Sequence, residues 1–353
     1  MRRTLVQRLR AGAKRALNRP WPTAIATELT FRFRKGRVAE LLRRHRALPR
    51  ALHIEGTNAC NARCVFCAYD QMRRPKTVMS MQQFERVIDE YVALGGSHVS
   101  MTPIVGDPFV DPHLFARLDY LARNPAIRGF YFFTNAILMT PETCERLFSF
   151  GERLTVCVSL GGFDGPTYAR LMGVDRFESV WENLRAFVAC RRAHRDGPRL
   201  EIHLRCPESD CVGARWDELQ EWVDGGLAVV ARIDTYDSWA GKISRVDLEA
   251  AGLEARPMPY KRGACELLYM KPVVLADGDV NACACRDVEA ELRVGGLEQQ
   301  SLDLVWKGAA LDELIARHER GDYPDVCRRC TYYVSVYNPL ASRIFHPSLN
   351  WKD

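Results

Sequence analysis

Three cysteines within one short segment constrain this chain more strongly than any other feature of its sequence. The segment Cys60–Cys67 reads C-N-A-R-C-V-F-C, which places three thiols at the spacing C-x3-C-x2-C. Iron in a cubane cluster prefers soft sulfur ligands, and three protein thiolates leave one of its irons open to another molecule. A structural zinc loop is the alternative, although zinc sites normally close with four ligands at two paired spacings. The segment therefore predicts an iron–sulfur site with an open coordination position.

Composition indicates a globular protein of a reducing compartment. The chain has 353 residues, 47% of them hydrophobic, which is enough for one large α/β domain or two domains. It has no run of 18 apolar residues, and its basic N-terminus lacks the apolar centre of a signal peptide. Its 13 cysteines are odd in number and clustered, which favours metal binding over disulfides. We therefore expect a cytoplasmic protein.

The positive charge is concentrated in residues 1–50, which carry 15 Lys and Arg against 2 acidic residues. If this arm is helical, its apolar residues share one face: Leu5, Leu9, Ala13, Ala16 and Leu17. A basic amphipathic helix of this kind lies on an anionic membrane surface or binds a phosphorylated partner. The alternative is a solvated helix packed loosely on the outside of the protein. No nucleic-acid partner is expected, because the arm lacks interleaved aromatic residues for stacking.

Strand-like and helix-like segments alternate from residue 51 onward. The expected strands are Ala51–Thr57, His98–Val105, Gly129–Thr134, Leu154–Leu160, Leu200–Cys206 and Leu227–Ile233. The expected helices run from an N-cap at Ser80 to Leu94, from near Pro112, and over Pro141–Phe150, Phe177–His194 and Trp216–Asp224. This alternation predicts a parallel sheet, and six such units are too few to close a regular eight-stranded barrel.

The pattern changes after about residue 250. Leu267–Leu275 and Val280–Cys285 are rich in β-forming residues and flank Asp277-Gly278, which predicts a hairpin. A helix-like segment, Leu302–Arg320, follows. Four cysteines accompany these elements, two of them as a C-x2-C pair: Cys265, Cys283, Cys327 and Cys330. Four thiolates close an iron–sulfur site completely, and they are also good ligands for zinc.

The cysteine segment and the strand order resemble the radical S-adenosylmethionine (SAM) superfamily. In that family SAM fills the open corner of a [4Fe–4S] cluster, and the aromatic residue before the third cysteine, here Phe66, lies against the adenine. The resemblance implies an α/β fold, a partial (β/α)6 barrel over residues 51–250, with the cysteine loop at the C-terminal ends of the strands. It implies that Cys60, Cys64 and Cys67 hold a cluster that receives an electron from a flavodoxin or ferredoxin. That electron cleaves SAM to a 5′-deoxyadenosyl radical, which abstracts hydrogen from a substrate.

Several strand ends resemble SAM-binding elements of this superfamily. Gly106-Asp107-Pro108 is similar to the Gly-Gly-Glu-Pro motif that meets the SAM amino group, with Asp107 in place of the usual Glu. Thr134-Asn135-Ala136 resembles a Thr-Asn-Gly turn. Ser159 stands where a polar group often lies near the ribose, and Arg205 is expected to pair with the SAM carboxylate.

Two further positions near these strand ends have open roles. Leu160-Gly161-Gly162 departs from a frequent Leu-Asp-Gly sequence, so that Asp164 either compensates for the missing carboxylate or is solvated in a loop. His203 shares a strand face with Arg205 and is interpreted as lining the barrel.

The C-terminal cysteines resemble the one-cluster "twitch" form of the SPASM-type extension of radical SAM enzymes. The resemblance implies a small α+β domain over residues 251–335, in which Cys265, Cys283, Cys327 and Cys330 hold an auxiliary [4Fe–4S] cluster. No cysteine follows Cys330, so one auxiliary cluster is expected, and residues 336–353 form a tail. Cys285 is a spare thiol beside Cys283. Three roles stay open for it: a substitute cluster ligand, a residue that faces the substrate, or an ordinary strand residue.

The remaining cysteines receive no cluster role. Cys206 and Cys211 bracket a proline-containing loop at the end of the fifth strand and are interpreted as buried or free thiols. Cys144, Cys157 and Cys190 fall within expected helices or strands and are interpreted as core.

The resemblance predicts a radical SAM oxidoreductase that acts on a small polar substrate such as a sugar, an aminocyclitol or a nucleotide-linked molecule. Dehydrogenation, epimerisation and deoxygenation all stay open, and no catalytic acid or base is identified. One alternative is a peptide-modifying maturase, although residues 1–50 are too short and too basic for a winged-helix peptide-recognition domain. The other alternative is a non-catalytic iron–sulfur or zinc protein. The basic arm suits a phosphorylated or membrane-tethered substrate at the inner membrane surface.

Overall fold

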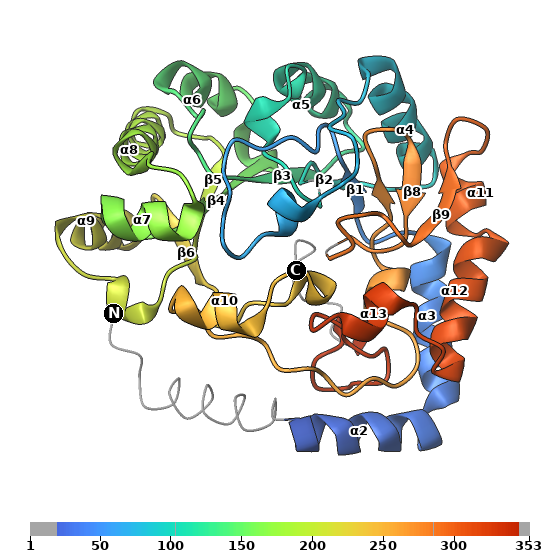
Figure 1. Ribbon diagram of the computed structural model, residues 1–353. Coiled ribbons are helices and arrows are strands. Elements are labelled where there is room, and N and C mark those ends of the chain that lie inside the picture. The colour runs from blue at the N-terminus through green and yellow to red at the C-terminus, as the bar shows by residue number, and fades with distance from the viewer. Residues whose placement is uncertain (1–19, 103, 285, 346–353) are drawn as a thin grey trace.

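A nine-stranded sheet forms the centre of the protein (Figure 1). The computed structural model describes residues 20–102, 104–284 and 286–345. The strands lie in the order β6-β5-β4-β3-β2-β1-β7-β8-β9. The first six pair in parallel: β1 (Leu52–Ile54), β2 (His98–Ser100), β3 (Gly129–Thr134), β4 (Leu154–Leu160), β5 (Arg199–Leu204) and β6 (Val229–Arg232). The predicted partial (β/α)6 barrel is thereby confirmed.

Helices cover the outer face of the parallel strands (Figure 1). They are α4 (Met81–Ala93), α5 (Leu114–Arg123), α6 (Pro141–Phe148), α7 (Gly165–Met172), α8 (Phe177–Ala193) and α9 (Ala214–Asp224), while α10 (Arg245–Ala250) lies away from the sheet. Ser80 caps α4 as predicted, because its hydroxyl accepts a hydrogen bond from the backbone amide of Gln83 at 3.2 Å. Helices α7 and α10 were not among the predicted elements. Short 3-10 turns complete the connections: η1 (Ala68–Gln71), η2 (Pro108–Val110), η3 (Gly151–Arg153), η4 (Glu208–Asp210) and η5 (Trp239–Gly241).

Alternation along β4 and β5 separates an apolar outer face from a polar inner face. On β5, Leu200, Ile202 and Leu204 are at most 2% exposed and pack under the helices. The intervening Glu201 and His203 therefore face the inside of the barrel. Because the strands are parallel, the inner-face residues of neighbouring strands form layers, and the last layer lies at the C-terminal edge.

The C-terminal part continues the same sheet rather than forming a separate one. Strand β7 (Val273–Val274) pairs in parallel with β1, and β8 (Asp279–Asn281) and β9 (Arg293–Gly296) add antiparallel strands. The predicted hairpin at Asp277-Gly278 joins β7 to β8, with Gly278 at φ +91°.

Three predicted elements in this part are wrong in their extent. The predicted segment Val280–Cys285 overlaps β8 only at Val280 and Asn281, because β8 runs over Asp279–Asn281. Residues Glu266–Tyr269 form the 3-10 turn η6 instead of the start of a strand, and the buried Glu266 carboxylate accepts hydrogen bonds from the backbone amide and side chain of Arg343, both at 2.7 Å. The predicted helix Leu302–Arg320 is two helices, α11 (Leu302–Trp306) and α12 (Ala309–Arg320). Gly308 separates them because its backbone is extended at φ −76° and ψ 159°. Helix α13 (Asp325–Arg329) and the turn η7 (Arg343–Phe345) complete this part.

The N-terminal helices α2 (Pro20–Phe33) and α3 (Lys35–Ala47) pack beside the C-terminal part (Figure 1). The indole of Trp306 donates to the carbonyl of Arg46 at 3.1 Å, and the Arg46 guanidinium pairs with Asp312 at 2.6 Å. Arg262 forms two hydrogen bonds to Glu28 at 2.8 and 2.9 Å. The predicted amphipathic face at residues 5–17 lies outside the described residues. Among the helices that the structure describes, none is long and apolar enough to cross a membrane.

Candidate active site

The three-cysteine loop follows β1 and is fixed to the end of α7. The backbone amides of Arg63 and Val65 donate to the carbonyls of Met172 and Leu171 at 3.1 and 3.0 Å. Gly173 ends α7 with φ +68°, and a Cβ at this position would lie 2.2 Å from the carbonyl oxygen of Arg63. The cysteine loop can therefore lie against α7 only because residue 173 has no side chain.

Burial disfavours free thiolates at all three cysteines of this loop. It raises the pKa of Cys60 to about 12 and that of Cys67 to about 11, and it raises the pKa of Cys64 well above its ordinary value. A bound metal reverses this preference because it coordinates only the deprotonated sulfur. Three partly buried thiols that converge from one loop fit a cluster that neutralises them.

The turn Gly106-Asp107-Pro108 packs directly on the cysteine loop. Gly106 has φ +116°, and a Cβ there would lie 2.9 Å from the carbonyl oxygen of Thr57, so this close approach requires glycine. The Asp107 amide donates to the carbonyl of Ala59 at 2.9 Å. The Asp107 carboxylate is buried and accepts hydrogen bonds from the amides of Phe109 and Asn135 and from the Thr134 hydroxyl, at 3.0, 2.7 and 2.9 Å. Asp107 thus joins two predicted SAM-binding turns.

Asn135 connects the end of β3 to the cysteine loop. Its side-chain amide nitrogen donates to the side-chain Oδ1 atom of Asn61 at 2.6 Å and lies 3.9 Å from the Cys60 sulfur. The next residue, Ala136, has φ +62°, which explains why related turns use glycine at this position. The predicted contact residues of β2, β3 and the cysteine loop therefore meet at one edge of the barrel.

Ser159 and Arg205 meet beside the aromatic residue of the cysteine loop. The Arg205 Nε atom donates to the Ser159 hydroxyl at 3.3 Å, and its guanidinium carbon lies 5.6 Å from the centre of the Phe66 ring. The Tyr236 ring lies 5.5 Å from the same ring. Burial lowers the pKa of Arg205, so a carboxylate ligand would stabilise its charge. Asp164 lies apart from this group and caps α7, because its carboxylate accepts from the Thr167 amide at 2.7 Å.

One polar group inside the barrel was missed at the sequence level. Cys157 pairs with Glu201 in one layer, His203 pairs with Ser159 in the next, and one sulfur, oxygen or nitrogen atom of Cys157, Glu201 and His203 lies within 4.8 Å of those of the other two. The Cys157 sulfur and the His203 Nε2 atom lie 3.8 and 3.7 Å from the same Glu201 oxygen. Cys157 is buried as predicted, at 1% exposed, and the alternation along β4 places it on the same inner face as Ser159. The alternation of Glu201, His203 and Arg205 along β5 was the available signal.

The four C-terminal cysteines line one cavity together with apolar and aromatic residues. Cys265 precedes η6, Cys283 follows β8, Cys327 lies on α13 and Cys330 ends that helix. The Tyr332 amide donates to the Cys330 sulfur at 3.3 Å, a bond that stabilises a ligating thiolate. Burial raises the pKa of Cys265 to about 12. The donor set therefore fits a fully ligated cluster, while Cys285 lies outside the described residues.

A stack of three side chains connects the two cysteine sites. The Trp239 indole donates to the Phe66 carbonyl at 2.7 Å. The Arg286 guanidinium carbon lies 4.7 Å from the Trp239 ring centre and 4.4 Å from that of Tyr332, so Arg286 lies between the two aromatic rings. The positive charge of Arg286 contributes to lowering the pKa of both Cys67 and Cys330, against the dominant effect of burial. One cation thus influences both sites.

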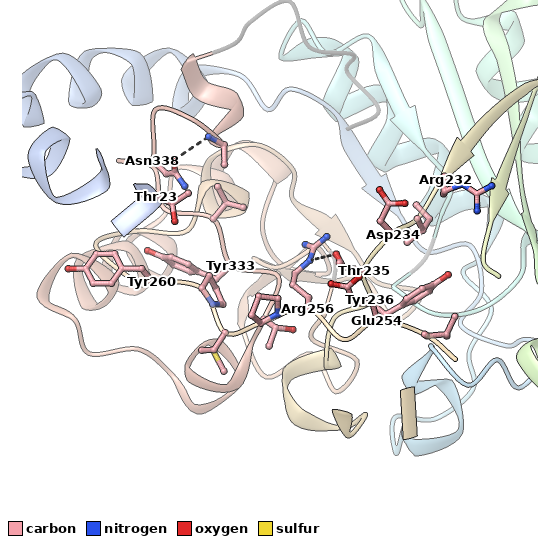
Figure 2. Close-up of a pocket in the computed structure, with 18 of the residues that line it drawn as sticks. Thr23, Arg232, Asp234, Thr235, Tyr236, Glu254, Arg256, Tyr260, Tyr333 and Asn338 are labelled. Atoms are coloured by element: carbon pink, nitrogen blue, oxygen red, sulfur yellow. Dashed lines mark hydrogen bonds between the residues drawn. The ribbon is translucent and has the colours of Figure 1, made fainter. Parts of the chain in front are cut away.

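A cavity of about 890 Å³ extends from the end of β6 to helix α2 (Figure 2). Figure 2 shows Arg232 and Asp234 at one end and Thr23, Tyr260 and Tyr333 at the other. Tyr236 lines this cavity and also contacts Phe66, so the cavity begins beside the predicted adenine site. Its walls carry both charged and aromatic side chains.

Comparison with known proteins agrees with this geometry. Residues 54–193 match the radical SAM superfamily, and residues 265–331 match the SPASM iron–sulfur cluster-binding domain. The mycofactocin maturase MftC of Mycobacterium ulcerans is 26% identical over 323 residues, which cover 81% of each chain. The GTP 3′,8-cyclase of Pasteurella multocida is 24% identical over 140 residues, 38% of this chain and 40% of that relative.

Solved structures share the fold at low sequence identity. BtrN in complex with AdoMet and 2-DOIA matches with a TM-score of 0.54 and 15% identity, over 82% of this chain and 95% of that chain. SuiB of Streptococcus suis, bound to its precursor peptide SuiA, matches with a TM-score of 0.54 and 18% identity, over 78% of this chain and 69% of that chain. The chain belongs to the radical SAM superfamily and carries a C-terminal SPASM domain. It is a radical SAM enzyme whose cofactors are a [4Fe–4S] cluster with SAM and an auxiliary cluster.

Proposed function

We propose that this enzyme is an oxidoreductase that abstracts hydrogen from a small polar substrate such as a sugar, an aminocyclitol or a nucleotide-linked molecule. The observation that supports this proposal most directly is the polar group of Cys157, Glu201 and His203 inside the barrel. An apolar interior would suit packing alone, whereas a carboxylate and an imidazole 3.7 Å apart can bind hydroxyl groups and transfer protons. A flavodoxin or ferredoxin is the proposed reductant.

The ligand assignments follow from the donor sets. We propose that Cys60, Cys64 and Cys67 hold the cluster that binds SAM, and that the auxiliary cluster has four ligands: Cys265, Cys283, Cys327 and Cys330. The proposed SAM contacts are Phe66, Gly106, Asp107, Pro108, Thr134, Asn135, Ser159 and Arg205. Because three protein donors already engage the Asp107 carboxylate, we propose that Asp107 shapes the turn and leaves the SAM ammonium to backbone carbonyls. When bound, the clusters and SAM supply a 5′-deoxyadenosyl radical and a site that accepts one electron.

Glu201 is the proposed acid–base residue. Conversion of a secondary alcohol to a ketone removes a hydrogen atom from the carbon, a proton from the hydroxyl group and one electron. Glu201 accepts the proton from the hydroxyl, and the His203 Nε2 atom lies 3.7 Å from the same carboxylate. Ser159, one layer closer to the strand ends than Glu201, and Arg205, one layer further, fix the SAM ribose and carboxylate above the substrate.

The test uses anaerobically reconstituted protein with SAM and dithionite. We expect methionine and 5′-deoxyadenosine to form, and a true substrate to stimulate their formation. A substrate that carries deuterium at the reacting carbon transfers it to 5′-deoxyadenosine. Glu201→Gln should retain deuterium transfer but lose the oxidised product. Retention of full product formation by Glu201→Gln would refute its role, while no stimulation by any polar small molecule would refute the substrate class.

A peptide-modifying maturase is the second candidate. The similarity to mycofactocin maturase MftC over 81% of both chains favours it, and the cavity of about 890 Å³ has room for a peptide segment. The same assay distinguishes the two candidates, because a precursor peptide would then stimulate 5′-deoxyadenosine formation and acquire the mass change.

A further inference from the structure

Two cysteines outside the cluster sites lie within reach of each other at the end of β5. The sulfur atoms of Cys206 and Cys211 are 3.9 Å apart. Both side chains are largely buried, with Cys206 3% and Cys211 8% exposed. The turn η4 between them fixes this spacing, because the amides of Asp210 and Cys211 donate to the carbonyls of Pro207 and Glu208 at 3.1 and 3.2 Å.

A cation lies next to one of these sulfurs. Arg232 ends β6, and its Nη2 atom is 3.3 Å from the Cys211 sulfur. Its Nη1 atom is buried and has no hydrogen-bond partner among the residues that the structure describes. The hydrogen bond from Cys206 and the charge of Arg232 together lower the pKa of Cys211, while the pKa of Cys206 is raised. Glu208 and Asp210 are the acidic groups nearby, and Arg170 pairs with Asp210 at 3.1 Å.

The pair is positioned for chemistry rather than for packing alone. Cys206, Pro207 and Arg232 line the large cavity, and the Cys211 sulfur lies directly behind them, 3.9 Å from the Cys206 sulfur and 3.3 Å from Arg232 Nη2. A disulfide requires the sulfurs to approach to about 2 Å, which the 3.9 Å separation allows after a modest rotation of the two side chains. A thiolate beside an arginine and a neighbouring thiol are the components of a dithiol that reacts with disulfides.

We propose that Cys206 and Cys211 form a redox-active dithiol site on the cavity wall, with small-molecule disulfides as its oxidants. The Cys211 thiolate attacks one sulfur of the disulfide, which breaks the S–S bond, forms a mixed disulfide and releases one thiolate. Cys206 then loses its proton to solvent and attacks the Cys211 sulfur, which forms the Cys206–Cys211 bond and releases the second thiolate. Two electrons thereby pass from the protein dithiol to the external disulfide. Arg232 is a positioning residue that stabilises the Cys211 thiolate.

Digestion with trypsin allows Cys206 and Cys211 to be analysed separately from the other cysteines. Cleavage after Arg205 and Arg215 releases the peptide CPESDCVGAR, which contains Cys206 and Cys211 and no other cysteine. Anaerobically reconstituted holoprotein is equilibrated with mixtures of glutathione and glutathione disulfide, and remaining thiols are then alkylated. We expect a fraction of this peptide to have lost two hydrogens and to carry no alkyl group, and this fraction should rise with the proportion of glutathione disulfide. A peptide that stays doubly alkylated at every ratio would overturn the proposal.

Single variants assign the two roles. Cys206→Ser should accumulate a glutathione adduct on Cys211, whereas Cys211→Ser should react at least about tenfold more slowly, because it lacks the activated thiolate. Arg232→Gln should slow alkylation of Cys211 about tenfold at neutral pH, and Arg232→Lys should restore most of the rate. Within the unaltered protein, Cys211 should be alkylated faster than the buried Cys144. Equal alkylation rates for Cys211 and Cys144 in the unaltered protein would refute the thiolate assignment without dependence on variant folding. Equal rates for Arg232→Gln and the unaltered protein would refute the role of Arg232.

Discussion

Replacement of Gly173 by alanine tests whether α7 holds the cysteine loop in place. Gly173 ends α7 at φ +68°, a conformation that costs an alanine about 1 kcal/mol. The new Cβ would also lie 2.2 Å from the Arg63 carbonyl oxygen, so the loop must move. Overpacking of this kind typically costs about 1–3 kcal/mol. We therefore expect Gly173→Ala to destabilise the protein by about 2–4 kcal/mol in all and to lower iron binding at Cys60, Cys64 and Cys67.

Gly321 provides a matched control for this substitution. It ends α12 in the same left-handed conformation, at φ +80°, but a Cβ there would meet no atom within 4 Å. Gly321→Ala therefore carries the backbone cost without the clash. The free energies of unfolding of both variants are measured by urea denaturation, and iron is counted after reconstitution. If Gly173→Ala is no more destabilising than Gly321→Ala and binds as much iron, the contact between α7 and the cysteine loop does not position the site.

Three further predictions concern ion pairs, pH and the connection between the clusters. Arg74 pairs at 2.9 Å with Glu55, which is 0% exposed, so Arg74→Met should lower the free energy of unfolding, measured by urea denaturation, by about 3–5 kcal/mol. Arg245→Met, at the exposed pair with Glu249, should lower it by less than about 1 kcal/mol. Equal losses of stability in the two variants would contradict this prediction. Burial holds the pKa of His53 well below 6.5, so the unfolded chain binds more protons and stability falls as pH drops below about 6.5. His53→Gln should reduce that slope between pH 7 and 5, and an unchanged slope would exclude His53 as its source. Arg286→Gln removes a positive charge that lies between the two cluster sites, so it should lower the reduction potentials of both clusters, by about 40 mV for each kcal/mol of electrostatic stabilisation lost. The potentials are measured by EPR-monitored titration. Unchanged potentials would show that Arg286 does not influence the clusters.

Local sequence patterns predicted the elements whose boundaries depend on local physics. Strands β3 and β4 have the predicted bounds, because each is a continuous run of β-forming residues buried on the helix side. Helix α4 begins directly after Ser80, as predicted, because the Ser80 side chain caps it by accepting from the Gln83 amide. Strand β2 ends at Ser100, earlier than predicted, because Thr102 leaves the ladder and its hydroxyl accepts from the Phe133 amide at 2.9 Å. Tertiary contacts of this kind have no local signature.

In the candidate site, too, local sequence patterns were predictable and tertiary contacts were not. The two cysteine sets and the strand-end motifs carry recognisable spacings, so a ligand role for the cysteines and a SAM-binding role for the strand ends could be predicted from sequence. The stack of Trp239, Arg286 and Tyr332 joins residues that are distant along the chain, and no spacing predicts it. The pairing of Cys206 with Cys211 was visible only as a weak C-x4-C spacing, and Arg232 enters that group from the neighbouring strand.

Iron content after removal of the first set of ligands tests the central claim, that two separate cysteine sets hold two clusters. The measurement is iron and labile sulfide per chain in the anaerobically reconstituted Cys60/Cys64/Cys67→Ala variant, with the unaltered protein beside it. The account predicts about eight irons in the unaltered protein and about four in the variant, the content of one four-thiolate cubane. Loss of all iron from the variant would contradict it, because Cys265, Cys283, Cys327 and Cys330 would then hold no cluster of their own.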